Sequence, residues 1–378
     1  MLKKDYTVFL VAVGLFGLTY GVYEMLIPFY LESRRVSFSR MGDIFAFSFL
    51  FAFLMRQYAG YLSDVLGRKP LFSTGLLLAG LGNFTTPFFG KAIIQAGLKS
   101  LREAAYGIKE TMQSVILYEG DHKNFLNNYG KNRGVEWILQ ALGIFLAGMI
   151  ASRFSIAFAF LLSGLLLFLA TLAFSVFFQG KRTVNEEAKR LTVQEIFSFD
   201  LKGKLRYLTF VYFLVNVNTG LSHGPTMPLF FKDRFQMSLA AIAVLMVFHR
   251  LSLGLPMLLV GRVKSDRLKF FYMLTLTLGG ASLVITPFIP TASVAIPVWL
   301  AHDLIGAGIW NPIHNYFTQK FAGEDIRGLH VSKSFAYGSL GTVFGYLLSG
   351  YLYSVDTGAP FVSAGLCAIL TAVLVVKL

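Results

Sequence analysis

The sequence predicts an all-α membrane protein with twelve transmembrane helices arranged in two pseudo-symmetric six-helix bundles. Hydrophobic residues make up 55% of the 378-residue chain and charged residues only 14%, and the mean hydropathy is +0.61. Apolar runs of about twenty residues recur along the whole length, and each could cross roughly 30 Å of hydrocarbon as a helix. Because lipid offers no hydrogen bonds to an open backbone, helices are the expected form of these runs.

The predicted spans follow one another with short connections, except after the sixth, where the longest polar stretch falls. We therefore expect an N-terminal six-helix bundle over 1–179, a cytoplasmic linker over 180–204 and a C-terminal six-helix bundle over 205–378. In chain order the spans are 6–31, 41–63, 70–90, 92–118, 134–152, 156–179, 205–231, 238–261, 269–289, 293–320, 329–353 and 359–377.

Within the linker, Thr192-Val193-Gln194-Glu195 has the pattern of a capping box, in which the first and last side chains bond to each other's backbone N–H. Ile196, Phe197 and Phe199 follow it. This pattern predicts a short amphipathic helix lying on the inner membrane surface, and the alternative is a solvated linker.

The net charge of +14 has a topological origin. If the hairpin near Gly60 faces the cytoplasm, Lys and Arg are concentrated at the cytoplasmic ends of the spans, as the positive-inside rule requires. We expect a multi-pass protein of the cell inner (plasma) membrane with both termini in the cytoplasm, and no nucleic acid as partner. The single cysteine, Cys367, excludes an intramolecular disulfide.

The two halves of the sequence resemble each other in four places, in the same order. An internal duplication into two parallel six-helix halves around a central cavity accounts for them. The pairs are Leu26-Ile27-Pro28-Phe29-Tyr30 with Met227-Pro228-Leu229-Phe230-Phe231, Gly60–Lys69 with Gly261–Lys269, Tyr106-Gly107-Ile108 with Ala307-Gly308-Ile309, and Arg133-Gly134 with Arg327-Gly328.

A short cationic hairpin, Gly60-Tyr61-Leu62-Ser63-Asp64-Val65-Leu66-Gly67-Arg68-Lys69, joins the second and third spans. Its carboxylate, Asp64, can lie against the positive N-terminal end of a neighbouring helix. The spacing resembles the G-x-L-x-D-x-x-G-R-K loop of the major facilitator superfamily, with Val65 where that family usually has a basic residue. The resemblance implies a conformational latch that breaks and re-forms between outward-open and inward-open states, made by Gly60, Asp64, Gly67, Arg68 and Lys69.

The resemblance to this superfamily extends over essentially the whole chain. It implies a monomeric alternating-access transporter whose first, fourth, seventh and tenth spans line the pathway. The glycine motif of the family's antiporters is incomplete in the fifth span, where Ala147 and Gly148 replace Gly-Pro. Close helix contacts are expected at the glycines of the fifth and eleventh spans, namely Gly134, Gly143, Gly148, Gly338, Gly341, Gly345 and Gly350.

Ionisable and amide side chains lie inside the same four spans. A charged residue costs about 2.5–3.5 kcal/mol at the centre of a spanning helix on insertion scales, so such residues usually face a cavity or each other. We therefore expect a substrate and proton cavity. Its predicted residues are Glu24, Arg102, Glu103, Lys109, Glu110, His223, His302, Asp303, Asn311 and His314.

Structural roles are the alternative for several of these residues. Arg102 with Glu103, and Lys109 with Glu110, are candidates for ion pairs within the fourth span. His302 beside Asp303 is the better candidate for proton exchange near neutral pH, and helical spacing predicts that Asp303 and His314 share a face. Outside this set, Arg56 is expected to brace the latch, and His249-Arg250 to be structural.

The leading functional hypothesis is proton-coupled secondary transport of a small polar or amphipathic organic solute, with membrane lipids as surroundings. The alternatives are a lipid or glycolipid flippase, and a divalent metal exporter using His223, His302, Asp303 and His314. Because no tight ligand motif is present, no dedicated metal site is expected. The sequence lacks H-E-x-x-H, G-x-S-x-G and phosphate-loop motifs, so neither an enzyme nor a cofactor is expected.

Overall fold

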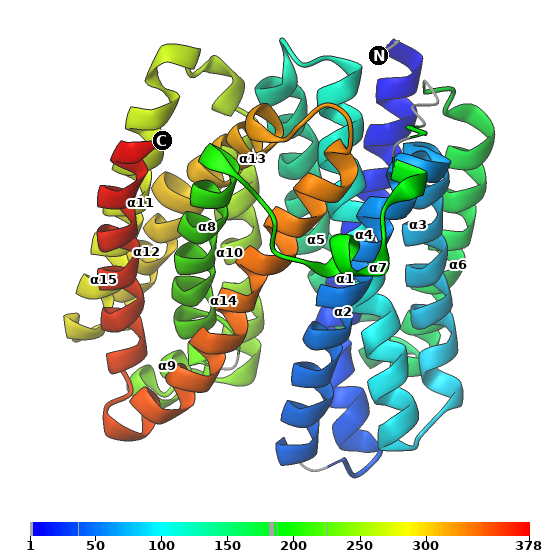
Figure 1. The fold of residues 1–378 in the computed structure, drawn as a ribbon. Helices are drawn as coiled ribbons and strands as arrows, with labels where there is room; N and C mark the ends of the chain where they lie inside the picture. Colours follow the sequence, from blue (N-terminus) through cyan, green and yellow to red (C-terminus); the bar gives the residue numbers. More distant parts are fainter. Residues whose placement is uncertain (1–2, 37, 181–184, 187, 225) are drawn as a thin grey trace. The chain divides into compact units, whose positions relative to one another are not determined.

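The computed structural model describes the chain except for residues 1–2, 37, 181–184, 187 and 225 (Figure 1). Its described residues form helices joined by short connections, with no strand among them. The α-helices are α1 (Lys3–Ser33), α2 (Phe38–Leu66), α3 (Arg68–Thr85), α4 (Ala92–Gly120), α5 (Phe125–Arg153), α6 (Ile156–Phe177), α7 (Val193–Phe197), α8 (Gly203–Ser222), α9 (Thr226–Phe235), α10 (Leu239–Met257), α11 (Leu268–Ile285), α12 (Ala292–His302), α13 (Gly308–Phe321), α14 (Arg327–Val355) and α15 (Ala359–Leu374).

Each predicted span coincides with one of these helices or with two in succession. Seven helices of the described chain are long and apolar enough to cross a membrane, so length and composition alone do not confirm the expected number of twelve. For two of the predicted spans that are not among these seven, the sequence gives a physical reason. The fourth span contains five ionisable residues, and the seventh is interrupted between Ser222 and Thr226, where Gly224 adopts a φ of +63°.

The chain forms two compact units. The first comprises 1–125, 135–200 and 322–333, and the second comprises 126–134, 201–321 and 334–378. Two helices are therefore divided near their N-terminal ends: the first turns of α5 belong to the second unit, and the first turns of α14 belong to the first unit.

The same helix pairs pack together within each unit. In the first unit α1 and α3 pack on α6, while α4 packs on both α2 and α3. In the second unit α8 and α11 pack on α15, while α12 and α13 pack on both α10 and α11. Counted by span, these are the same pairings, as the duplication predicts.

A further repeat ends the third span of each half. Thr86-Pro87-Phe88 and Thr286-Pro287-Phe288 lie two hundred residues apart, and each forms a 3₁₀ turn. In each turn the threonine hydroxyl donates a 2.7 Å hydrogen bond to a carbonyl four residues earlier. Proline fits the first turn of such a helix because it has no N–H to leave unpaired.

Glycines allow close crossings between α5 and α1, and between α14 and α8. A Cβ added at Gly143 would lie 2.0 Å from the carbonyl oxygen of Leu18, and one at Gly341 would lie 2.0 Å from that of Phe213. The predicted close contacts are confirmed at these positions and at Gly134, Gly338 and Gly345. They are wrong for Gly148 and Gly350, because a Cβ there would meet nothing within 4 Å.

The linker contains the predicted capping box. The Thr192 N–H donates to Glu195 Oε2 at 2.7 Å, and the Glu195 N–H donates to Thr192 Oγ1 at 3.2 Å. Hydrogen bonds from Thr192 lower the pKa of Glu195. The helix α7 packs against α2 (Figure 1) and Ile196 is buried, so this side chain faces protein, and the position of the helix on the inner membrane surface stays a prediction. Residues 181–184 and 187 of the linker lie outside the described residues.

Candidate functional site

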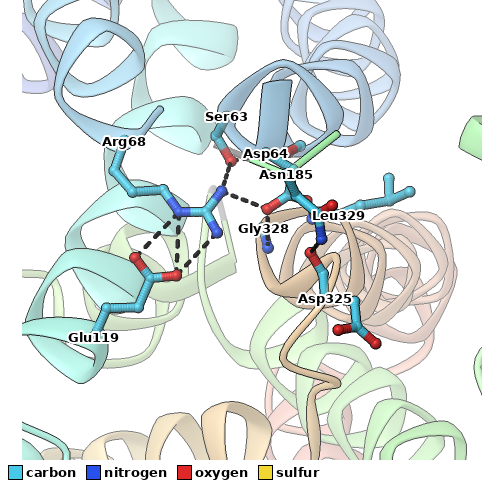
Figure 2. Close-up of polar contacts among 9 residues, drawn as sticks. Ser63, Asp64, Arg68, Glu119, Asn185, Asp325, Gly328 and Leu329 are labelled. Atoms are coloured by element: carbon cyan, nitrogen blue, oxygen red, sulfur yellow. Dashed lines mark hydrogen bonds and ion pairs between the residues drawn. The ribbon is translucent and has the colours of Figure 1, made fainter. Parts of the chain in front are cut away.

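The predicted latch is assembled within the first unit, where the segment 322–333 contributes the first residues of α14. Figure 2 shows Asp64 facing that helix end. Asp64 Oδ1 accepts from the Gly328 N–H at 3.0 Å, and Oδ2 accepts from the Leu329 N–H at 2.8 Å. These N–H groups have no partner within their own helix, and the helix dipole favours a negative charge at this end. The predicted position of Asp64 against a helix N-terminus is therefore confirmed.

Arg68 connects the latch to α4. Its guanidinium bonds to Asp64 and to Ser63 Oγ, and its Nη2 lies 2.9 Å from Oε1 of Glu119 (Figure 2). Burial raises the pKa of the Asp64 carboxyl, while Arg68 and the two backbone N–H donors oppose that rise. The hairpin pattern contains Ser63, Asp64 and Arg68 but not Glu119, which lies at the end of α4. Glu119 is therefore absent from the predicted residues.

Two glycines are required by the geometry of the latch. A Cβ at Gly60 would lie 2.2 Å from Ser332 Oγ, which no side chain could tolerate. Gly67 has a φ of +99°, a conformation open to glycine but strained for other residues.

Lys69, the last residue of the predicted latch, is partly exposed at the start of α3.

A buried ion pair also forms in the N-terminal half of α4. Lys99 Nζ lies 2.8 Å from Oε1 of Glu103 and 3.7 Å from Oε1 of Glu24. The predicted pairing of Arg102 with Glu103 is wrong, because adjacent residues on a helix point in different directions, whereas residues four apart are neighbours. Glu24, on α1, is thus brought close to Lys99 of α4, and the role of these residues in a cavity stays a prediction.

The C-terminal half of α4 pairs with two other helices. Lys109 Nζ lies 2.6 Å from Oε1 of Glu136 on α5, and both side chains are fully buried. Arg56 on α2 binds Glu110 at 2.6 Å. Lys109 and Glu110, expected as a pair within the fourth span, thus each bind a residue of another helix, and Arg56, expected to brace the latch, binds α4. Glu136 was missed, although a carboxylate inside the predicted fifth span was a signal that could have identified it.

Arg102 is a buried cation whose hydrogen bonds are incomplete. Its Nε donates to Asn83 Oδ1 at 3.0 Å. Its guanidinium carbon lies 4.9 and 4.8 Å from the ring centres of Phe16 and Tyr20, distances typical of cation–π contact. Its two terminal nitrogens, Nη1 and Nη2, are buried and have no hydrogen-bond partner. A buried guanidinium in this state is able to bind a polar group of a ligand.

In the second unit, three histidines and one carboxylate converge. His302 Nε2 lies 3.4 Å from His223 Nε2 and 3.3 Å from Asp303 Oδ1, while His249 Nδ1 lies 3.1 Å from Asp303 Oδ2. The side chains come from the C-terminal end of α8, from α10, and from the junction after α12. His249 was interpreted as structural from the sequence, and the structure places it in this cluster.

His314 and Asn311 lie apart from that cluster. His314 bonds through Nδ1 to the Tyr272 hydroxyl at 2.9 Å and stacks on Tyr212 at a centroid distance of 4.2 Å. The predicted shared face of Asp303 and His314 is wrong, since a π-helical segment, Asp303–Ala307, separates them and changes the helical register. The Oδ1 atom of Asn311 is buried without a hydrogen-bond partner.

Comparison with known proteins agrees with this architecture. A family model described as the Major Facilitator Superfamily matches residues 129–332. The chain is 25% identical over 367 residues to Multidrug resistance protein 2 of Bacillus subtilis (strain 168), covering 91% of this chain and 88% of that protein. It also resembles the crystal structure of the human organic anion transporter MFSD10 (TETRAN), with a TM-score of 0.83 at 16% identity over 99% of both chains. The E. coli fucose:proton symporter FucP gives a TM-score of 0.76 at 12% identity over 98% of both chains. These two structural likenesses show a shared fold.

Proposed function

The chain belongs to the Major Facilitator Superfamily, a family of multi-pass membrane transporters, and from this premise we propose that it transports a small amphipathic organic solute with an acidic group. Transport would proceed by alternating access, with the latch around Asp64 stabilising one of the two states. The protein is a transporter and not an enzyme. We further propose that it is a monomer in the cell inner membrane with both termini in the cytoplasm.

The observation that supports this substrate class is the environment of Arg102. Its two unpaired terminal nitrogens match the two oxygens of a carboxylate or phosphate, and the rings of Phe16 and Tyr20 offer an apolar wall beside them. Arg102 is 0% exposed in this conformation, so the solute would reach it in another state of the cycle. Multidrug resistance protein 2 and the human organic anion transporter MFSD10 are named for drugs and organic anions, and these names support an organic solute as the substrate.

We expect Arg102→Gln to abolish recognition of the acidic group. Purified protein would be screened by thermal shift against amphipathic carboxylates and their methyl esters, and the best ligand would be tested for uptake into proteoliposomes. A hydrogen bond to a charged group contributes about 1.5–3 kcal/mol, so the variant should bind the carboxylate at least about tenfold more weakly.

Arg102→Lys, which keeps the charge but not the planar fork, should recover only part of this affinity. Arg153→Gln, at the exposed end of α5, is the matched control. Equal binding of acid and ester, or an unchanged affinity in Arg102→Gln, would refute the proposed substrate class.

We also propose that a proton drives transport through Glu24, Glu110 or Asp303. A proton changes which state is favoured only if it binds the two states with different affinity. Among these groups Glu24 has a buried Oε1 without a hydrogen-bond partner, 3.7 Å from Lys99. An inward proton gradient should therefore accelerate uptake.

Replacing the responsible carboxylate by its amide should remove this acceleration while substrate exchange continues. Glu186→Gln, in the exposed linker, is the control. The proton hypothesis fails if Glu24→Gln, Glu110→Gln and Asp303→Asn all retain the gradient dependence.

A further inference from the structure

The cluster of His223, His249, His302 and Asp303 in the second unit presents one ligand atom from each residue, all within 4.8 Å of one another. Three of the four side chains are buried and His223 is partly buried. Two features of this cluster point to a cation at its centre: the hydrogen bonds that fix the imidazole tautomers, and the distances between the ligand atoms.

The tautomers follow from the bonds made on the outer side of two rings. His302 Nδ1 faces the carbonyl oxygen of Trp299, which can only accept, so this nitrogen bears the proton. Ser222 Oγ donates to the carbonyl of Asn218, and therefore accepts from His223 Nδ1 at 2.8 Å. With both Nδ1 atoms protonated, the neutral rings of His223 and His302 each direct an Nε2 lone pair inward.

The Nε2 lone pairs of His223 and His302 face each other, and that of His302 also faces the carboxylate of Asp303. The two Nε2 atoms are 3.4 Å apart, and Asp303 Oδ1 lies 3.3 Å from that of His302. Neither oxygen of Asp303 forms a hydrogen bond, and His249 Nδ1 forms none either, although it lies 3.1 Å from Asp303 Oδ2. Acceptors that converge in a buried site repel one another unless a cation lies between them.

Three of the separations are close to the edges of a tetrahedral metal site, and the four ligand atoms together lie within 4.8 Å. Ligands about 2.0–2.1 Å from a tetrahedral zinc ion lie roughly 3.3 Å from each other, near the 3.1, 3.3 and 3.4 Å of these three pairs. The bonds from His223 to Ser222 and from His302 to Trp299 are the outer-shell contacts that typically orient metal-binding imidazoles. The π-helical segment begins at Asp303, directly after His302, the last residue of α12.

We propose that His223, His249, His302 and Asp303 form a binding site for one divalent first-row transition metal ion, with zinc as the reference ion. Three imidazoles and one carboxylate suit zinc, cobalt or nickel and are poor ligands for magnesium or calcium. Arg250 interacts electrostatically with Asp303, and its positive charge opposes the ion. The site lies wholly within the second unit, joining the end of α8, α10 and the α12 junction, and it is separate from the Arg102 site. It shares Asp303 with the proton proposal above, and because a metal ion on this carboxylate would displace its proton, the site leaves Glu24 and Glu110 as the carriers of the coupling proton.

The test uses purified full-length protein without a polyhistidine tag, stripped of metal with a chelator. Titration with Co²⁺ should give a saturable visible absorption spectrum of four-coordinate cobalt at one ion per chain, and Zn²⁺ should displace it. Both ions should raise the unfolding temperature, whereas Mg²⁺ should not. His249→Ala and Asp303→Asn should each weaken binding by more than the 10–100-fold typical of losing an outer-shell partner.

His314→Gln is the matched control, because it removes a buried imidazole of the same unit outside the cluster. Arg250→Gln should tighten binding, which a purely structural role of the cluster would not produce. Absence of a saturable Co²⁺ spectrum with the wild-type protein would overturn the proposal without needing any variant to fold. An equal loss of binding in His314→Gln would also overturn it. Because the readout is binding, its failure leaves the proposed transport function untouched.

Discussion

Lys109→Met is expected to lower the unfolding temperature of the purified protein sharply, whereas Lys109→Met combined with Glu136→Gln should recover most of the loss. Both partners are 0% exposed and their charged atoms are 2.6 Å apart. Removing one charge leaves the other buried and unpaired, which typically costs about 3–5 kcal/mol. Replacing both together removes the desolvation cost along with the attraction, and such double replacements are often close to neutral.

The design isolates the charges from the packing. Methionine keeps most of the lysine's apolar volume, while the cation–π contacts of Nζ with the rings of Phe16 and Tyr106 are lost together with the charge in both variants. The control is the same pair of changes at Lys189 and Glu186, an ion pair of the linker whose side chains are 48% and 77% exposed. Exposed pairs contribute only about 0–1 kcal/mol. A double variant as unstable as Lys109→Met would contradict the pairing seen here.

This cycle also separates structure from transport. If the double variant is stable and still moves solute, the pair serves to hold α4 against α5. If it is stable and inactive, the charges take part in the transport cycle itself. The same distinction applies to Arg56 and Glu110, which join α2 to α4 in the same unit.

Features encoded over a few neighbouring residues could be predicted from the sequence. The span ranges follow from runs of apolar residues, the capping box from Thr192 and Glu195, and the acceptor role of Asp64 from its place beside a short hairpin. The pair of Lys99 with Glu103 belongs to this class too, because the residues are four apart on one helix. It was missed because charges adjacent in sequence were paired instead.

Partners on different helices could not be predicted in this way. Glu136 lies 27 residues from Lys109, and helical spacing says which face a residue occupies but not which helix packs on that face. The place of His249 in the histidine cluster could not be predicted for the same reason, because its partners lie on other helices. The error at His314 has a local cause, since one π-helical segment shifts the register of every residue that follows it.

Asp64→Ala is expected to release the segment 322–333 from the rest of the first unit, because two N–H groups at the start of α14 lose their acceptor. Leaving a buried donor unsatisfied costs about 1–3 kcal/mol, so the opened population should rise by about tenfold or more. Arg327 and Lys333 are 7% and 1% exposed, and tryptic cleavage beside them would report the opening, since cleavage tracks the population of the open form when opening is fast.

The matched control for this latch is Asp266→Ala, at the corresponding place in the second half, where the residue is exposed on a 3₁₀ turn. Asp64→Asn should fall between Asp64→Ala and the wild type. Asparagine keeps one accepting oxygen and replaces the other with an NH₂ group, so only one of the two N–H donors at the start of α14 can keep its partner. If cleavage of Asp64→Ala is no faster than that of Asp266→Ala, the bonds to Gly328 and Leu329 do not hold the segment closed. If Asp64→Asn is cleaved as fast as Asp64→Ala, the negative charge rather than the accepting oxygen is what secures α14.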